Sequence, residues 1–266
     1  MQYFVFCQSD IILERIGDSY RIPTEPPTDI KPWTTVMNVD GNKAYRIDQP
    51  ISSESDGTPQ ASNGKQYEMC PLRQSFFKLS ADDYRKAGKC HELLYWDQNT
   101  KYCGVCGAPM RFDTDISKKC TECGKEIWPQ LATAVIVLIR RKTMASDGQP
   151  AKEEVLLVHA KNFHGDHYGL VAGFVETGET LEEAVYREVL EEVGLHITNL
   201  RYFGSQPWPY PCGLMVGFTA DYDYGKIHLQ RTELTKGAWF DRDHLPQIPQ
   251  KMSIARQLID AWLEEG

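Results

Sequence analysis

The stretch TLEEAVYREVLEEVGL, residues 180–195, constrains the fold more than any other part of this 266-residue chain. Its apolar residues recur with helical spacing and Gly194 follows them, which predicts a helix over Leu181–Val193 that stops at the glycine. At about 100° per residue, Glu188 and Glu192 fall inside the apolar arc of this helix, one turn apart. A helix built only to pack would carry leucine or valine at both positions.

Two carboxylates on a buried arc need a partner. Like charges at i, i+4 destabilise a helix, and desolvation increases the penalty. A divalent cation removes both penalties, and carboxylate oxygens suit hard Mg²⁺ or Mn²⁺. We therefore expect Glu188 and Glu192 to bind a metal ion, with Glu191 at the flank of the arc. The alternative, a solvated glutamate face, suits Glu182 and Glu183, which point elsewhere.

Four cysteines form a compact block in two CxxC pairs. Cys103 and Cys106 are separated from Cys120 and Cys123 by thirteen residues, and each pair is followed by glycine. This spacing is typical of a zinc ribbon with four thiolate ligands, the alternative being a redox pair. Four thiolates leave no position for water, so we expect one structural zinc ion per chain. The remaining cysteines lack such spacing and are expected to be small apolar core residues: Cys7, Cys70, Cys90 and Cys212.

The bulk composition limits the function classes. A formal charge of −8 and a pI of about 5.4 argue against a dedicated nucleic-acid or anionic-membrane binder, but not against an enzyme that acts on one end of a nucleotide. The N-terminal sequence MQYFVFCQSDIILE has neither a basic n-region nor a long apolar run. We expect a cytoplasmic protein with reduced thiols and no membrane segment.

The order of patterns predicts three parts: a mixed N-terminal domain over 1–98, the ribbon over 99–128, and an α+β domain over 129–266. The first part contains extended runs, a proline-rich connector over 22–33, a polar loop over 51–65 and a helix capped by Ser80. The last part contains the strand runs TAVIVLIRR, EVLLVHA, LRYFGS, GLMVGFTADY and GAWFD, and a final helix in SIARQLIDAWLEEG.

The segment SQPWPYP, residues 205–211, has three prolines and two large aromatics in seven positions. Proline donates no backbone hydrogen bond and fixes φ, so the segment cannot be a central strand or a helix interior. We expect it to be stiff, extended and at an edge. It is either a loop whose aromatics pack on the core or a preformed wall of a binding site.

The stretch from Gly173 to Leu195 matches the Nudix box, G-x5-E-x7-R-E-U-x-E-E-x-G-U. The chain therefore resembles the Nudix family. Nudix proteins hydrolyse a nucleoside diphosphate linked to another group, with box glutamates holding Mg²⁺ or Mn²⁺. The resemblance implies an α/β/α sandwich for 129–266. It makes Glu188 and Glu192 the metal ligands and Glu191 a supporting residue, with either Glu191 or Glu192 accepting the proton. The remaining catalytic positions are Glu179 and Arg187, and Arg187 is placed to pair with Glu179 or Glu191.

Four features resemble the NADH pyrophosphatases of the bacterial NudC type: the proline segment, the ribbon before the catalytic domain, WPQLAT after it, and LRQSF in the N-terminal part. The resemblance implies that Phe174 and Trp128 sandwich the adenine, with Trp128 donated by the second subunit of a homodimer. Ala172, through its carbonyl, and Glu233 are implied as further metal ligands. The other implied substrate contacts are Arg73, Asp115, Ala255 and the run Gln206, Pro207, Trp208, Pro209, Tyr210, Pro211, Cys212 and Gly213.

The sequence departs from that subfamily at three positions. Its motif usually reads S-Q-P-W-P-F-P-x-S, so Tyr210 replaces a phenylalanine and Gly213 replaces a serine. The first change keeps the ring, and the second removes a hydroxyl worth about 1 kcal/mol as a hydrogen-bond partner. Trp128 stands where tyrosine is common, which keeps the stacking platform.

The resemblance predicts metal-dependent cleavage of NADH and NAD⁺ to a nicotinamide mononucleotide and AMP, and removal of NAD caps from RNA 5′ ends. One alternative is the same chemistry on another nucleoside diphosphate, such as ADP-ribose. Another is a non-catalytic nucleotide sensor whose ribbon reads nucleic acid. A sensor would lose box glutamates, whereas Glu188, Glu191 and Glu192 are all present.

Overall fold

The computed structural model describes residues 1–27, 33–47, 65–144, 152–163 and 165–265. The chain divides into two compact units. The N-terminal unit comprises Met1–Leu131 together with Pro207–Cys212, and the C-terminal unit comprises Ala132–Gln206 and Gly213–Gly266. None of the helices in the described ranges combines the length and apolarity that crossing a bilayer requires.

The C-terminal unit is built on a mixed sheet with the strand order β13-β14-β10-β11-β15, and β12 also pairs with β10. The central strand β10 runs parallel to β14 and antiparallel to β11 and β12. The elements of this unit are β10 (Ala132–Lys142), β11 (Glu153–Ala160), β12 (Val171–Phe174), α3 (Leu181–Val193), β13 (Leu195–Trp208), β14 (Gly213–Gly225), β15 (Leu234–Asp241) and α4 (Ile254–Glu264).

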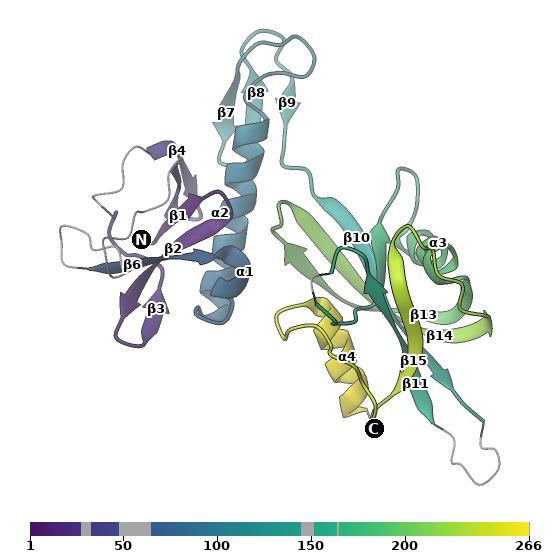
Figure 1. The fold of residues 1–266 in the computed structure, drawn as a ribbon. Helices are drawn as coiled ribbons and strands as arrows, with labels where there is room; N and C mark the ends of the chain where they lie inside the picture. Colours follow the sequence, from purple (N-terminus) through teal and green to yellow (C-terminus); the bar gives the residue numbers. More distant parts are fainter. Residues whose placement is uncertain (28–32, 48–64, 145–151, 164, 266) are drawn as a thin grey trace. The chain divides into compact units, whose positions relative to one another are not determined.

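The two faces of this sheet explain why β10 is apolar at almost every position. Successive side chains of a strand point to opposite faces. Val135 and Val137 lie in the core cluster with the apolar face of α3, and Ile136 and Leu138 lie in the cluster with α4. Helices therefore cover both faces, as Figure 1 shows for α3 and α4. This is the predicted α/β/α sandwich, and the fold class is confirmed.

The N-terminal unit contains a second mixed sheet with the order β3-β2-β1-β5-β4, and β6 pairs with β2. Strand β1 is parallel to β5 and antiparallel to β2. The long helix α2 packs on this sheet, with Leu93 and Leu94 in the same core cluster as Phe4 and Phe6. The elements are β1 (Tyr3–Cys7), β2 (Asp10–Ile16), β3 (Ser19–Arg21), β4 (Trp33–Val39), β5 (Asn42–Ile47), β6 (Gln66–Pro71), α1 (Leu72–Ser75) and α2 (Ala81–Asn99).

A small three-stranded sheet follows α2 and carries the cysteines. Its order is β7-β8-β9, with β7 (Met110–Thr114), β8 (Ser117–Cys120) and β9 (Glu126–Ile127). One buried lysine links it to α2. The Lys118 ammonium lies 2.6 Å from the Asp97 carboxylate, and it donates to the backbone carbonyls of Asp97 and Thr100 at 3.0 and 3.2 Å. Lys118 therefore satisfies carbonyls at the C-terminal end of α2 that have no partner within the helix.

The sequence located the described elements well. Helix α3 has the predicted bounds, Gly194 ends it in the left-handed region at φ 68°, and the Ser80 side chain caps α2. The short strand β12 was not expected, because VAGF is too short to show a period. The predicted loop over 51–65 lies outside the described residues except at its end. The domain boundaries at 98 and 128 stay predictions.

Candidate active site

Helix α3 presents the box residues, and both of its ends are fixed locally. The Thr180 hydroxyl accepts from the Glu183 backbone N–H at 3.1 Å, and the Glu183 carboxylate accepts from the Thr180 N–H at 2.8 Å. This reciprocal capping box satisfies two N–H groups that lack partners within the helix. Gly194 accepts the left-handed conformation at the other end without a steric penalty. The register of the helix, and so the direction of each glutamate, follows from these few residues.

Of the two arc glutamates, Glu192 is buried, as predicted, and Glu188 is partly buried. The exposed fraction of Glu192 is 4%, and that of the Glu188 side chain is 12%. They share the helix face with Val185 and Val189, which are fully buried, whereas the Glu191 side chain is 53% exposed. Within the described part of the chain, no basic side chain forms an ion pair with Glu192. A carboxylate in this position needs a cation or a proton.

Arg187 organises the carboxylates around it. Its Nε and Nη2 donate to Glu179 at 2.5 and 2.9 Å, and its Nη1 donates to Glu188 at 2.8 Å and to Glu191 at 3.2 Å. Nη2 also donates to the backbone carbonyl of Phe174 at 2.9 Å. The predicted pairing of Arg187 with Glu179 and Glu191 is confirmed. The planar guanidinium thus fixes three carboxylates and the end of β12 at once.

Gly173 leaves room for Glu188. A Cβ atom built at this glycine would overlap the Glu188 carboxylate, so no other residue fits without displacing it. Gly173 pairs with Val135 in the middle of the sheet, and its neighbour Ala172 pairs with Ile136. The sheet therefore holds the backbone of β12 directly beneath the carboxylate. This contact gives a physical reason for a glycine at the first position of the box.

The electrostatics of the cluster are those of crowded carboxylates. Burial, with the charges of Glu188, Glu233 and Glu191 added, raises the pKa of Glu192 to about 8. Burial also raises the pKa of Glu188, although Arg187 opposes the shift. Hydrogen bonds from Arg187 lower the pKa of Glu179 to about 2, so this residue stays ionised. Ionisation of Glu188 and Glu192 is therefore disfavoured, and a bound cation would favour it again.

The charge of Glu233, on another element, acts on these carboxylates. The residue lies in the turn before β15, where its carbonyl accepts from the Lys161 N–H at 2.8 Å and its own N–H donates to the Gln230 carbonyl at 3.0 Å. Its charge raises the pKa of both Glu188 and Glu192. An oxygen-only donor set of this kind suits a hard divalent cation. Glu233 is 41 residues beyond Glu192 in the chain, so no spacing rule connects the two.

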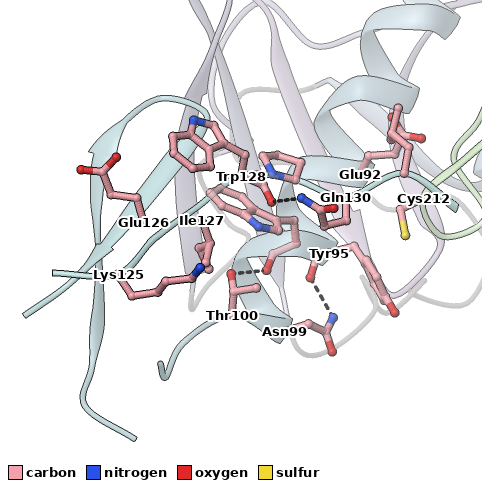
Figure 2. A pocket seen from close by; sticks show the side chains of 13 residues that line it. Glu92, Tyr95, Asn99, Thr100, Lys125, Glu126, Ile127, Trp128, Gln130 and Cys212 are labelled. Carbon is pink, nitrogen blue, oxygen red and sulfur yellow. Dashed lines mark hydrogen bonds between the residues drawn. The ribbon is translucent and has the colours of Figure 1, made fainter. Parts of the chain in front are cut away.

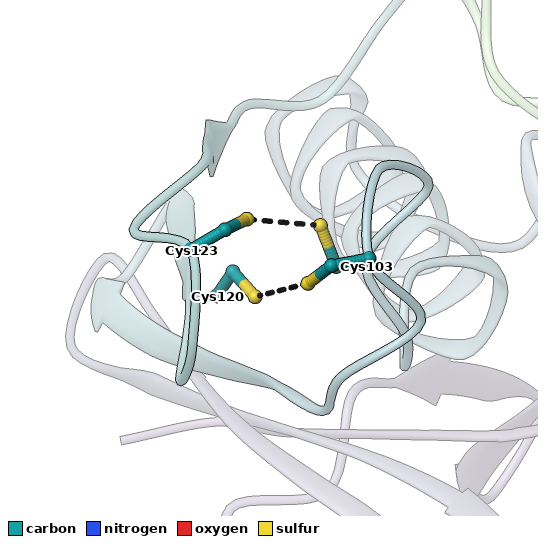
Figure 3. A group of neighbouring side chains, drawn as sticks. Cys103, Cys120 and Cys123 are labelled. Atoms are coloured by element: carbon teal, nitrogen blue, oxygen red, sulfur yellow. Dashed lines mark hydrogen bonds between the residues drawn. The ribbon is translucent and has the colours of Figure 1, made fainter.

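The four ribbon cysteines form the second candidate metal centre. Among the described residues, they are the one group of three or more potential ligands whose ligating atoms all lie within 4.8 Å of one another. The sulfur atoms of Cys103 and Cys123 are 3.6 Å apart, and those of Cys106 and Cys120 are 3.4 Å apart. Figure 3 shows this group of side chains, with Cys103, Cys120 and Cys123 labelled. Backbone N–H groups, first that of Glu122, lower the pKa of Cys120 to about 6. The thiolate form that metals bind is therefore favoured at Cys120.

A pocket of 530 Å³ lies within the N-terminal unit, between α2 and the segment after β9 (Figure 2). Trp128, which is 50% exposed, lines it with Cys212. Sequence reasoning named these two residues and missed the others. Four of those follow α2 at positions 92, 95, 96 and 99, a helical period that could have revealed one face. In full, the lining residues other than Trp128 and Cys212 are Glu92, Tyr95, Trp96, Asn99, Thr100, Lys125, Glu126, Ile127, Pro129, Gln130 and Leu131.

The first part of the proline segment is extended and lies at an edge, as expected, whereas its last residues, 209–211, form a turn. Strand β13 ends within it, at Trp208, and β13 is the edge strand of its sheet. Its second residue, Gln206, belongs to the C-terminal unit, where its amide donates to the Met252 carbonyl at 2.7 Å and accepts from the Ile254 N–H at 2.7 Å. The next six residues belong to the N-terminal unit. Tyr210 packs against the core cluster there, so the packing interpretation holds for this ring.

The other predicted substrate residues have these positions. Phe174 ends β12 and is 66% exposed, and the buried Ala255 is in the first turn of α4. Arg73 is exposed on α1, and its guanidinium carbon lies 5.3 Å from the centre of the Trp208 ring. Asp115 is exposed in the turn between β7 and β8. Their predicted roles remain predictions.

Comparison with known proteins decides the family. A family model for the NUDIX domain matches residues 130–262. The NAD-capped RNA hydrolase NudC of Haemophilus influenzae (strain PittGG) is 41% identical over 191 residues, covering 70% of this chain and 69% of that protein. The chain belongs to the NUDIX family. The resemblance to NudC-type enzymes, inferred from the sequence motifs, is confirmed with it.

Two further relatives carry the same name. This NUDIX chain is 38% identical to the NAD-capped RNA hydrolase NudC of Chromobacterium violaceum over 193 residues, 72% of this chain and 69% of that protein. It is 40% identical to the NudC of Pseudomonas aeruginosa over 194 residues, and the match spans 66% of the length of that relative. Among solved structures, a NUDIX hydrolase from Nitrosomonas europaea matches with a TM-score of 0.42 and 21% identity, covering 62% of this chain and 91% of that one.

Proposed function

We propose that this protein hydrolyses the diphosphate bond of NADH and NAD⁺, giving nicotinamide mononucleotide (reduced or oxidised) and AMP, and removes the NAD cap from RNA 5′ ends. The observation that carries the proposal is the carboxylate pair on one face of α3: the buried Glu192 and the partly buried Glu188, which Arg187 holds and which lies over Gly173. The names of relatives at 38–41% identity support the choice of substrate.

The chain supplies oxygen ligands for Mg²⁺ or Mn²⁺. Glu188, Glu192, Glu233 and the backbone carbonyl of Ala172 would hold the ion. When bound, such a cation neutralises diphosphate charge and lowers the pKa of the water that attacks phosphorus. Arg187 keeps Glu188 oriented, and Glu191 or Glu192 accepts the proton from that water. The burial of Glu192 makes it a strong ligand only once its proton has been lost.

Aromatic side chains bind the dinucleotide in this proposal. Phe174 and Trp128 stack on the adenine, since purines stack well on aromatic faces. Trp128 comes from the second subunit of a homodimer, and the protein acts in the cytoplasm. The backbone and side chains of Gln206–Gly213 line the dinucleotide site, and Arg73, Asp115 and Ala255 add contacts.

The ribbon cysteines are proposed to hold one structural zinc ion per chain. Four thiol groups gathered within 4.8 Å match a closed tetrahedral shell. Metal analysis of the purified protein should give one zinc per chain. Cys106→Ser should lose it, whereas Cys70→Ala, which alters a buried core cysteine, should keep it. Retention of zinc in both variants would contradict the assignment.

The function is tested by incubating the purified protein with NADH and Mn²⁺ and separating the products by chromatography. The appearance of AMP and reduced nicotinamide mononucleotide would support hydrolysis of the diphosphate bond. Their absence with Glu192→Gln would support the proposed metal site. The same assay on RNA that carries a 5′ NAD cap tests decapping. Cleavage of ADP-ribose without cleavage of NADH would show that the proline segment was misread. No cleavage of any diphosphate would favour the sensor.

A further inference from the structure

Helix α2 carries a glycine in its interior, where glycine is a poor helix former. The contact opposite Gly88 explains it. A Cβ atom at Gly88 would lie 3.1 Å from Cγ and 3.6 Å from Cβ of Pro209, so the buried proline ring packs directly on the helix backbone. Alanine at this position would press on a ring that has little freedom to move. The glycine therefore marks the place where the proline segment is seated.

A second contact lies one turn earlier on the same face. The hydroxyl groups of Tyr84 and Tyr210 are 2.6 Å apart and partly buried. Both rings pack against the core cluster of the N-terminal unit, and Phe76 contacts the Tyr84 ring edge-on at a centroid distance of 5.3 Å. Each hydroxyl supplies the hydrogen-bond partner that burial demands of the other. This gives a reason for the tyrosine at 210, where the NudC-type motif usually has phenylalanine.

Trp208, in the same segment, also has a partner. Arg73 stacks on Trp208 at 5.3 Å, and Trp208 meets Tyr210 edge-on at a centroid distance of 5.1 Å with an interplanar angle of 75°. Trp208, Pro209 and Tyr210 thus each contact a residue from the first 90 positions of the chain. All of these contacts lie inside the N-terminal unit.

We propose that Tyr84 and Gly88 are positioning residues for dinucleotide recognition: α2 seats the proline segment, and the N-terminal unit thereby sets substrate affinity without supplying a catalytic group. The inference rests on the proposed function. It assigns a task to helix α2, in which the sequence shows no chemical motif. A segment held in its bound shape loses little entropy on binding, so loosening its seat weakens binding rather than the chemical step.

The test is a KM-against-kcat comparison with NADH and Mn²⁺. Tyr84→Phe leaves the Tyr210 hydroxyl partly buried without its partner, so KM should rise about 5-fold while kcat stays within about 2-fold. The double variant Tyr84→Phe/Tyr210→Phe removes both hydroxyls and should return KM toward the wild-type value. Gly88→Ala should raise KM about 10-fold. Gly204→Ala, where a Cβ meets nothing within 4 Å, is the matched control.

The opposite pattern overturns the proposal. If Tyr84→Phe and Gly88→Ala lower kcat with an unchanged KM, they only reduce the fraction of folded enzyme. If the double variant is as impaired as Tyr84→Phe, the hydroxyl pair is not the cause.

A second measurement does not depend on the substrate. Hydrogen exchange at the Tyr210 amide, which bonds to the Trp208 carbonyl at 2.7 Å, should be faster in Tyr84→Phe and Gly88→Ala than in the wild type. Unchanged exchange would overturn the seating on its own. If the wild type does not cleave NADH but exchange responds as expected, the proposed function fails and the seating stands.

Discussion

Helices α2 and α3 each contain one feature that a helix should avoid, and the two features have different origins. In α3 it is Glu192, a carboxylate with an exposed fraction of 4%. In α2 it is Gly88, a glycine in the helix interior. The first is visible from spacing alone, because the apolar arc of α3 is defined by its own neighbours. The second has no local signature, because its cause is Pro209, 121 residues away in the chain.

The difference separates two kinds of constraint. A site that needs several groups at helical spacing can be recognised from one short stretch of sequence, as α3 is from Arg187, Glu188 and Glu192. A scaffold that seats a distant segment needs only a gap and a hydroxyl, as α2 provides with Gly88 and Tyr84. Chemical sites are therefore found in sequence more easily than the surfaces that position them. Four experiments test how far this contrast extends.

The largest effect is expected on α3. Glu192→Gln removes a charged ligand of the proposed cation, so kcat/KM for NADH should fall about 10³-fold. Glu182→Gln changes an exposed glutamate in the first turn of the same helix and should stay within about 2-fold of the wild type, as surface substitutions do. Steady-state kinetics with Mn²⁺ checks both. Equal activity of the two variants would show that α3 carries no metal site.

A stability effect of similar size is expected at the end of α2. Lys118→Met leaves Asp97, whose side chain is 13% exposed, without its ion-pair partner, and should destabilise the N-terminal unit by about 3–5 kcal/mol. The neighbouring Lys119, 51% exposed and paired with Glu126, is the control: Lys119→Met should cost no more than about 1 kcal/mol. Denaturant unfolding measures both free energies. Similar values would mean that Lys118 does not hold the ribbon to α2.

A smaller effect is expected at the strand beneath α3. Gly173→Ala forces the Glu188 carboxylate away from β12, so activity with NADH should fall about 10- to 100-fold, as for other residues that orient metal ligands. Added Mn²⁺ should restore part of the loss if metal affinity is what changed. Gly204→Ala serves as the control, because a Cβ there contacts nothing within 4 Å. Full activity of Gly173→Ala would show that Glu188 tolerates displacement.

The smallest effect concerns pH. Because the folded state raises the pKa of Glu192 to about 8, from the ordinary value of 4.5, the folded metal-free protein binds a proton that the unfolded chain has released. The stability from this group is complete below pH 4.5 and is lost as pH rises through about 8. The melting temperature of the metal-free protein should therefore fall by a few degrees between pH 5 and pH 8, the range that the raised pKa of Glu192 covers.

Two controls sharpen the pH experiment. Glu192→Gln carries no titrating group at this position and should flatten the decline. Addition of Mg²⁺ to the wild type at high pH should recover the lost stability, because the cation binds the ionised carboxylates. A wild-type melting temperature that does not change with pH would contradict the burial of a titrating Glu192.

Local sequence determined much of this protein. Helix α3, its capping by Thr180 and its stop at Gly194 follow from a few neighbouring residues, and so does the direction of Glu188 and Glu192. The CxxC spacing predicted that four cysteines lie close together, because the short chain segments between them limit how far the sulfur atoms can separate. The apolar run TAVIVLIRR indicated the strand β10. These features share one physical property: the pattern that reveals each of them lies within about ten to twenty consecutive residues.

Tertiary structure alone decided the rest. It placed the charge of Glu233 where it raises the pKa of Glu192, put the Glu188 carboxylate over Gly173, and joined Lys118 to the end of α2. It also assigned Pro207–Cys212 to the N-terminal unit, although the flanking residues belong to the other one. None of these contacts has a sequence period, because each joins elements whose separation along the chain is set by loops. Their geometry follows from the packing of whole elements, which a local pattern does not encode.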